Sequence, residues 1–427
     1  MLPSETKQFD RIPPRGLPWI AGAFITAALT FNVPVAAQPL TLERALQLTR
    51  EYNPDLLAAR QELEIARGRL VKAEYPSQFN PELSGEGARR SLGGGGSGTD
   101  YGVALSQELE VAGQRGKRIE EARANIEVVE QRVRDRTRVI EGEVKRTFFT
   151  ALARRQRRDL LQRVEELNRR VRDASKARVE AGESPVMEAN LGEIRFGQSR
   201  KETIVAERDY TVALLALKRL LNSAPDVTLD PSGELRETPV HYVLADLVTR
   251  ARETRPDLLA SRREVERVDA ETALTRRLIV PNPTLEGFYR EEPGAEGAEH
   301  IAGGGIRIPL PVFDRRQGEL VALAGRRGQA QFEVDATLRT VEQEVAEALQ
   351  DYEAARREVE IFEHDILTRA DENFRFIETA YRAGKIDFLQ FVVVQNDLVS
   401  AQLSYVDSLA AFRDAEVNLE RAVGTPL

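Results

Sequence analysis

The residue types that carry most enzyme and metal chemistry are scarce in this sequence of 427 residues. It contains no cysteine, two methionines and three histidines, His241, His300 and His364, which are far apart in the chain. The absence of cysteine rules out thiolate nucleophiles, thiolate metal ligands, disulfides and a cysteine-linked lipid anchor. No group of residues supplies a nucleophile, a base and an orienting partner. We therefore expect no enzyme activity, no cofactor and no resident metal.

Charge and the first residues indicate where the protein works. The chain has 61 Lys and Arg against 69 Asp and Glu, and because phosphate binding needs a basic surface we expect no nucleic-acid partner. Arg11 and Arg15 precede an apolar stretch over 19–31 and a small-residue cleavage site at 35–37. This order predicts a signal peptide over 1–37 and an exported protein. Later apolar stretches are too short for membrane-spanning helices.

The sequence is a tandem duplication. The segment PDLLA at 54–58 recurs at 256–260, an offset of 202 residues. The same offset relates Asn-Pro at 80–81 to Asn-Pro at 282–283, and the later Ala-Gly pairs to one another. A register held over that distance indicates two copies of one unit. The predicted organisation is a first repeat over 38–224, a linker over 225–242 and a second repeat over 243–427.

Each repeat contains a stretch that predicts a very long helix. Residues 117–181 contain no proline and one glycine, and residues 329–383 contain neither. In the first stretch Ile119, Ile126 and Val133 recur every seven residues, which is coiled-coil spacing. Together with the segments that follow, these stretches predict two long antiparallel helical hairpins.

The hairpins are predicted to turn near 181–185 and 383–387, where each begins with Ala-Gly. Glycine allows the left-handed conformation that ends a helix. Ser184 and Asp387 are expected to cap the helices that return from these turns.

The segments before the long helices predict β-hairpins, at about 79–110 and 283–312. Each contains runs of about ten residues with partial apolar alternation around a glycine-containing loop, a pattern typical of transmembrane strands and also of a soluble hairpin. Four strands are too few to close a barrel in one chain. Because an open sheet edge is not tolerated in lipid, a membrane location requires several chains.

With this layout the sequence resembles the TolC-like outer membrane efflux family over nearly the whole chain after the signal peptide. The resemblance rests on the opening segment 42–56, the repeated Asn-Pro and the Ala-Gly turns. The stretches LSQELEVAGQR at 105–115 and PLPVFD at 309–314 are similar to the heavy-metal efflux branch, the CzcC/CusC-like proteins.

The resemblance implies a fold that is mainly α with a small transmembrane β part. A long α-helical coiled-coil barrel would continue into a trimeric β-barrel with four strands per chain. It implies a homotrimer in the outer membrane of a Gram-negative bacterium, in contact with lipid and with a large periplasmic portion. The partners implied are a periplasmic adaptor and an inner-membrane RND pump, and the implied function is a passive exit duct for heavy-metal cations.

The resemblance also assigns candidate sites to the tips of the hairpins. The residues expected to dock the adaptor or pump are Arg178, Ala181, Gly182, Glu183, Ser184, Tyr381, Ala383, Gly384, Lys385 and Asp387. The residues expected at the periplasmic aperture are Glu188, Tyr381 and Gln390. A ring of three Glu188 side chains would favour cations, whereas a solvated glutamate on a helix surface would have no such role.

Two other functions remain open at this stage. The same duct could serve drugs, other organic solutes or type I protein secretion. A protein of another class, a periplasmic coiled-coil adaptor or structural protein, would also have long hairpins, although the 202-residue duplication counts against it.

Overall fold

The computed structural model describes residues 39–427 except 92–96, 237–238, 295–296, 384 and 387, so the predicted signal peptide lies outside the described residues. The first repeat contains six elements: α1 (Leu42–Tyr52), α2 (Pro54–Ala73), β1 (Glu82–Ser91), β2 (Ser97–Glu108), α3 (Gln114–Glu180) and α4 (Val186–Leu220). The second contains α5 (Leu244–Thr254), α6 (Pro256–Arg277), β3 (Thr284–Gly294), β4 (Gly297–Arg307), α7 (Gln317–Ile361), the π-turn η1 (Phe362–Ile366), α8 (Leu367–Arg382) and α9 (Phe388–Val423). The mainly helical fold with a small four-stranded part is confirmed.

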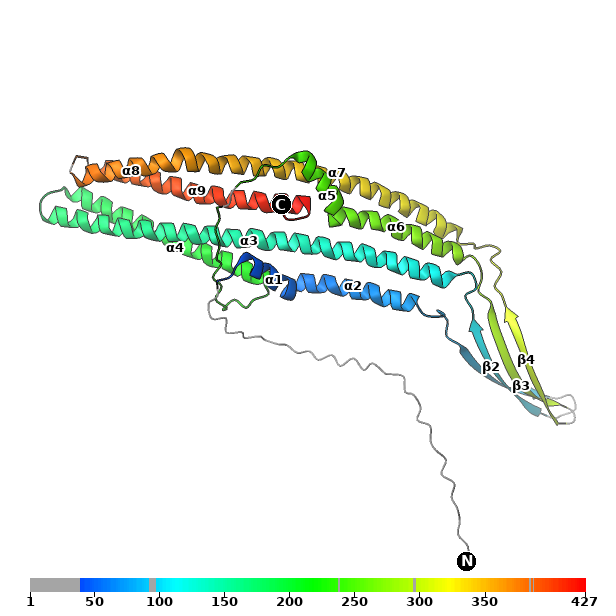
Figure 1. Ribbon diagram of the computed structural model, residues 1–427. Coiled ribbons are helices and arrows are strands. Elements are labelled where there is room, and N and C mark those ends of the chain that lie inside the picture. The colour runs from blue at the N-terminus through cyan, green and yellow to red at the C-terminus, as the bar shows by residue number, and fades with distance from the viewer. Residues whose placement is uncertain (1–38, 92–96, 237–238, 295–296, 384, 387) are drawn as a thin grey trace, which may run out of the picture. The chain divides into compact units, whose positions relative to one another are not determined.

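The four strands form one antiparallel sheet in the order β1-β2-β3-β4 (Figure 1). The β2–β3 pair, in which Tyr101 lies opposite Glu291 and Glu108 opposite Thr284, joins the two repeats. Among the described residues, β1 pairs only with β2 and β4 only with β3. Each outer strand therefore leaves a row of backbone donors and acceptors without a partner strand in this chain.

The long hairpins differ in one respect. Helix α3 runs without interruption for 67 residues, whereas the equivalent path in repeat two is α7, the five-residue π-turn η1 and α8. In a π-turn the backbone bonds join residues five apart in place of the four of an α-helix. Neither proline nor glycine occurs in 362–366, so no helix-breaking residue predicts this break. No helix among the described residues has the length and apolar character needed to cross a membrane.

The main core lies where both repeats and their connection meet. Leu217 of α4 and Leu419 of α9, equivalent residues, are both fully buried. Leu235 of the connecting segment is also fully buried in this core. The same segment is bonded to α7 through Tyr352, whose hydroxyl donates to the carbonyl of Val240 at 2.9 Å and accepts from its N–H at 3.0 Å. The connection therefore fastens the repeats together.

Equivalent residues close the base of each hairpin with different chemistry. Asn53, which caps α2, donates through its amide to the carbonyl of Leu220 at 2.8 Å. The counterpart of Asn53 is Arg255, whose guanidinium donates to the carbonyl of Ala422 at 2.9 Å. Leu220 and Ala422 are themselves 202 residues apart. In each repeat the residue before Pro-Asp-Leu thus satisfies a carbonyl that the end of the second long helix leaves free.

Candidate functional site at the helical tips

Both hairpins turn with the same backbone pattern. The N–H of Glu183 donates to the carbonyl of Arg178, and the N–H of Lys385 donates to the carbonyl of Ala380, each at 2.9 Å. This six-residue closure is the Schellman form of helix ending. Gly182 has φ +76°, as expected for the left-handed residue of such a turn. The equivalent Gly384 lies outside the described residues.

The expectation that Ser184 caps α4 is wrong. The cap position is held by Pro185, with φ −67° and ψ 148°, and no side chain accepts a bond from the first amides of α4. Ser184 precedes the cap position, and the proline at that position has no side-chain oxygen that could accept a bond from those amides. The Oγ of Ser184 is buried without a hydrogen-bond partner. Asp387, the cap expected in repeat two, lies outside the described residues.

Three of the predicted residues meet beneath the tips and connect the repeats. Arg178 of α3 donates to Glu188 of α4, with 2.9 Å between Nη1 and Oε1, and lies 3.4 Å from the hydroxyl of Tyr381 on α8. That hydroxyl donates to Glu188 at 3.5 Å. The Glu188 side chain is 13% exposed, so this ion pair is screened less than a surface pair.

An aromatic stack supports this cluster, and the sequence analysis missed it. The ring of Tyr381 stacks on Phe391 of α9, with 4.9 Å between centroids and 21° between planes. Phe391 is buried with Val392 in a small apolar cluster that also includes Val171 of repeat one. Burial, and next the charge of Glu188, raise the pKa of Tyr381 above its usual value. The hydroxyl therefore stays protonated, and able to donate, at physiological pH.

The other predicted tip residues face solvent. Ala181, Gly182, Glu183, Ala383 and Lys385 are exposed, and so is Gln390 on the first turn of α9.

Exposed apolar side chains at the tips are a second feature that the sequence analysis missed. Met187 of α4 is 68% exposed, and its counterpart Leu389 of α9 is 57% exposed. Val186 beside Met187 is 65% exposed. The 202-residue offset, applied to 187 and 389, was the signal that could have found them. Each tip thus combines charged and apolar side chains that one chain leaves uncovered.

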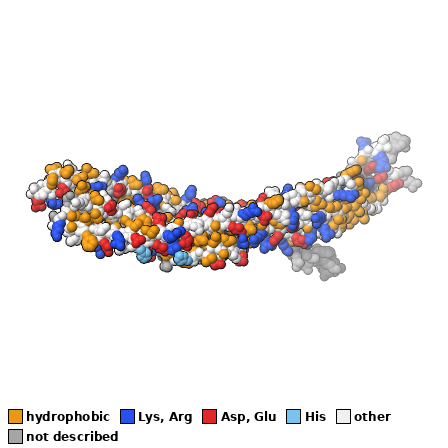
Figure 2. Space-filling model, turned by 90° about the horizontal axis from the view of Figure 1, so that it is seen from above, with side chains coloured by type: hydrophobic (Ala, Val, Ile, Leu, Met, Phe, Trp, Pro, Cys, Tyr) orange, Lys and Arg blue, Asp and Glu red, His pale blue; other side chains and the backbone are white. Residues whose placement is uncertain are grey.

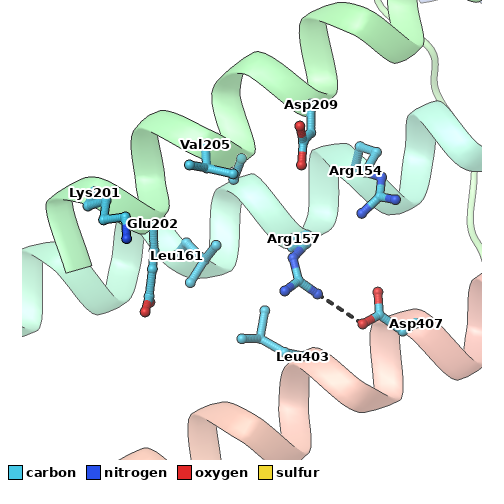
Figure 3. Close-up of a pocket in the computed structure, with 10 residues that line it drawn as sticks. Arg154, Arg157, Leu161, Lys201, Glu202, Val205, Asp209, Leu403 and Asp407 are labelled. Atoms are coloured by element: carbon cyan, nitrogen blue, oxygen red, sulfur yellow. Dashed lines mark hydrogen bonds and ion pairs between the residues drawn. The ribbon is translucent and has the colours of Figure 1, made fainter. Parts of the chain in front are cut away.

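A groove of about 570 Å³ lies further along the hairpins, between α3, α4 and α9 (Figure 3). Arg157 of α3 crosses it to Asp407 of α9, with 2.9 Å between Nη1 and Oδ2. Arg157 belongs to the basic run 154–158, whose Arg155 pairs with Asp230 at 2.8 Å. The basic run therefore contributes ion pairs that hold the scaffold together.

Charges elsewhere on the helices are mixed in sign. Figure 2 shows acidic and basic side chains interspersed along the face in view, with apolar side chains exposed among them. In the part of the chain that the structure describes, no group of three or more His, Asp or Glu is arranged to hold a metal ion.

Comparison with known families decides what this arrangement belongs to. The sequence model of the outer membrane efflux proteins matches residues 45–223 and again 247–425, once for each repeat. The chain belongs to this family. Its two matches confirm the tandem duplication predicted from the 202-residue offset.

Relatives of this outer membrane efflux protein include one from a metal-resistance system. The chain is 28% identical over 405 residues to the cobalt-zinc-cadmium resistance protein CzcC of Cupriavidus metallidurans, which covers 92% of this chain and 93% of CzcC. The fold of this chain is similar to that of CusC, with a TM-score of 0.70 at 16% identity over 90% of this chain and 92% of CusC. It is also similar to the open-state MtrE channel of Neisseria gonorrhoeae, with a TM-score of 0.71 at 18% identity over 90% and 89% of the two chains.

Proposed function

We propose that this protein is one subunit of a trimeric exit duct in the outer membrane of a Gram-negative bacterium, with its helices in the periplasm. The observation that carries the proposal is a four-stranded sheet, with β1 and β4 unpaired at their outer edges, in a member of the outer membrane efflux protein family. Lipid cannot satisfy those backbone groups. Three chains of four strands each would pair every edge in one closed β-barrel, and the hairpins would form a helical barrel below it.

Membrane fractionation tests this proposal directly. Cells expressing the protein are separated on a sucrose density gradient, and the outer-membrane band is washed with carbonate. The exit duct predicts carbonate-resistant protein in that band, running as a trimer after gentle solubilisation. Recovery in the soluble periplasm would contradict it and would favour the adaptor or structural protein, since such a protein keeps its β-hairpins outside the membrane.

We further propose that the duct receives heavy-metal cations from an inner-membrane RND pump through a periplasmic adaptor. The support is the 28% identity to a cobalt-zinc-cadmium resistance protein over nearly the full length of both chains. Cation selection would lie in the pump, because the described residues of the duct hold no metal-ligand cluster. Drugs, other organic solutes or secreted proteins are the alternative cargo for the same duct.

Cargo is tested by deletion of the gene in its own host. Increased sensitivity to cobalt, zinc and cadmium, with unchanged sensitivity to drugs and detergents, supports metal cargo. Increased sensitivity to drugs and detergents, with unchanged sensitivity to these metals, indicates organic cargo. That result does not contradict the proposal of an outer-membrane duct.

The tips are proposed to dock the adaptor and to close the aperture. Charged and apolar exposed side chains, such as Glu183, Lys385 and Met187, suit a protein partner. Glu188 and Tyr381 are proposed to line the aperture, and the bonds that Arg178 donates to both are proposed to favour its closed form. The variant Glu188→Gln in a planar bilayer should conduct with reduced cation preference, and unchanged selectivity would contradict a role for this carboxylate.

A further inference from the structure

A second groove, of about 400 Å³, lies where the end of α9 meets α3 and the junction of α5 and α6 (Figure 1). An excess of cations lines it, and such an excess in a groove attracts anions. The charged side chains of its lining are four cations and two carboxylates, those of Arg134, Arg138, Lys145, Arg421, Glu141 and Glu420.

Both carboxylates of this groove are already paired with cations. Glu420 forms an ion pair with Lys145, and Glu141 pairs with Arg50, with 2.5 Å between Oε1 and Nε. Arg138, in turn, is paired with a carboxylate outside the lining, that of Asp135, at 2.6 Å. The remaining arginines of the groove therefore have no carboxylate of the lining left to pair with.

These remaining arginines are Arg134 and Arg421. Within the described part of the chain, neither guanidinium forms a hydrogen bond or an ion pair. Partial desolvation, and next the charges of Arg146 and Arg138, lower the pKa of Arg421. Arg50, which has a carboxylate partner, has its pKa raised instead. Arg421 is thus a cation held beside other cations, and a nearby anion would stabilise it.

A glycine of the long helix α3 lies next to Arg421. Gly142 is the one glycine of residues 117–181, although glycine is among the least favourable residues in a helix interior. It lines the groove, and a Cβ at this position would lie 3.4 Å from Cδ of Arg421. A side chain longer than that of alanine would therefore enter the space beside Arg421. The glycine keeps this part of the groove open.

The segment after α9 adds a neutral donor to the lining. Thr425 lines the groove, and its Oγ1 is buried without a hydrogen-bond partner. A buried hydroxyl without a partner is destabilising. An oxyanion in the groove would offer this hydroxyl an acceptor.

We propose that this groove binds a small anion with two or more oxyanion groups, phosphate or carboxylate, along the row formed by Arg134, Arg138 and Arg421. Arg134 and Arg138 are one helical turn apart on α3, and Gly142, beside Arg421, is one turn further. These positions span roughly 12 Å of α3. A guanidinium binds phosphate or carboxylate through paired N–H donors, and two unpaired arginines suit a ligand with at least two negative charges.

The proposal does not depend on the trimeric duct, because every residue of the groove belongs to one chain. The other repeat does not reproduce the arrangement. The counterpart of Arg134 is Ala336, and the counterpart of Arg421 is Arg219. Arg219 has a carboxylate partner, Glu143, at 3.7 Å. It therefore provides a matched control outside the groove.

Isothermal titration calorimetry of the purified protein in detergent tests the site, with pyrophosphate and citrate as probes at constant ionic strength. The expected result is saturable binding of at least one probe, with one site per chain. Binding of pyrophosphate alone would indicate a phosphate ligand, and binding of citrate alone a carboxylate ligand. If neither probe binds saturably, the proposal is overturned.

Charge removal tests which residues hold the anion. Arg421→Gln and Arg134→Gln should each raise the dissociation constant by ~10-fold or more, because each removes a guanidinium that has no carboxylate partner in the chain. Arg219→Gln removes the same charge at the equivalent position and should leave the dissociation constant unchanged. An equal effect of Arg219→Gln and Arg421→Gln would show attraction to the general surface charge and would overturn the site.

A change of shape without a change of charge tests the groove itself. Gly142→Leu fills the space beside Arg421 and should abolish binding, whereas Gly142→Ala, whose Cβ makes an ordinary contact, should bind as the wild type does. Far-UV circular dichroism checks that both variants are folded. Wild-type affinity in folded Gly142→Leu would overturn the placement of the anion beside Arg421. If Gly142→Leu does not fold, the comparison of Arg421→Gln with Arg219→Gln decides.

Discussion

Replacement of Arg255 by alanine is expected to weaken the base of the second hairpin strongly. Arg255 is 2% exposed, and its guanidinium pairs with Asp257 and with Glu344, each at 2.6 Å. It also donates to the carbonyl of Ala422 at 2.9 Å. The variant leaves two carboxylates and a carbonyl without this donor, and breaking a buried pair in this way costs about 3–5 kcal/mol.

The expected loss lies at the lower end of that range. The side chain of Asp257 is 28% exposed and that of Glu344 is 47% exposed, so water replaces part of what each loses. We expect Arg255→Ala to lower the free energy of unfolding by about 3 kcal/mol. Asn53→Ala, at the equivalent position, removes a neutral hydrogen bond and a helix cap and should cost about 1–2 kcal/mol.

Urea unfolding followed by far-UV circular dichroism, at one protein concentration in detergent, measures these differences. Arg252→Ala is the matched control, because Arg252 is 50% exposed and pairs with Glu342 at 2.6 Å, for which we expect about 1 kcal/mol or less. If Arg255→Ala lowers the free energy of unfolding no more than Asn53→Ala, the conclusion that buried ion pairs stabilise this position is wrong.

The same variant has an expected pH dependence. Burial tends to raise the pKa of Asp257, but the hydrogen bond and charge of Arg255 outweigh it and hold that pKa below its usual value. The ionised carboxylate therefore stabilises the fold above its ordinary pKa, and this stability is lost as the pH falls through the lower pKa of the folded state. The difference in stability between wild type and Arg255→Ala should narrow in acid. A difference that is constant down to about pH 2 would refute the electrostatic origin.

Three further predictions concern the tips and the core. Gly182→Ala forces an alanine to φ +76° in open space and should cost about 1 kcal/mol of unfolding free energy, measured by urea unfolding; no loss would contradict the strain. Tyr381→Phe removes the hydroxyl between Arg178 and Glu188 and should raise the open fraction in single-channel recordings by about tenfold. An open fraction equal to that of the wild type would contradict a role of this hydroxyl in keeping the aperture closed. Leu217→Ala, at a fully buried position, should cost about 2–5 kcal/mol by the same unfolding assay.

Much of the fold could be predicted because it depends on long regular patterns. The long stretch with no proline and one glycine predicts α3, and the 202-residue offset predicts the duplication that the family matches confirm. The π-turn at 362–366 could not be predicted, since no helix-breaking residue lies in this segment. The prediction that Ser184 caps α4 was wrong for a local reason, because α4 begins one residue later than expected and Pro185 holds the cap position.

The candidate site was only partly accessible from the sequence. Arg178 was named for docking, Glu188 for the aperture and Tyr381 for both. Only the folded chain brings the three into one hydrogen-bonded cluster. Phe391 was missed because nothing local distinguishes one aromatic residue on a long helix from another. Its position beneath Tyr381 depends on how α8 packs on α9.

The repeated backbone explains why its contacts are kept while their chemistry changes. Two copies of one unit place equivalent Cα atoms at equivalent spacings, and a pair of side chains at such positions need only be complementary. Asn53 and Arg255 satisfy equivalent carbonyls with an amide and a guanidinium. The same backbone contact is thus kept by different residues in the two repeats, because each residue need only be complementary to the carbonyl it meets.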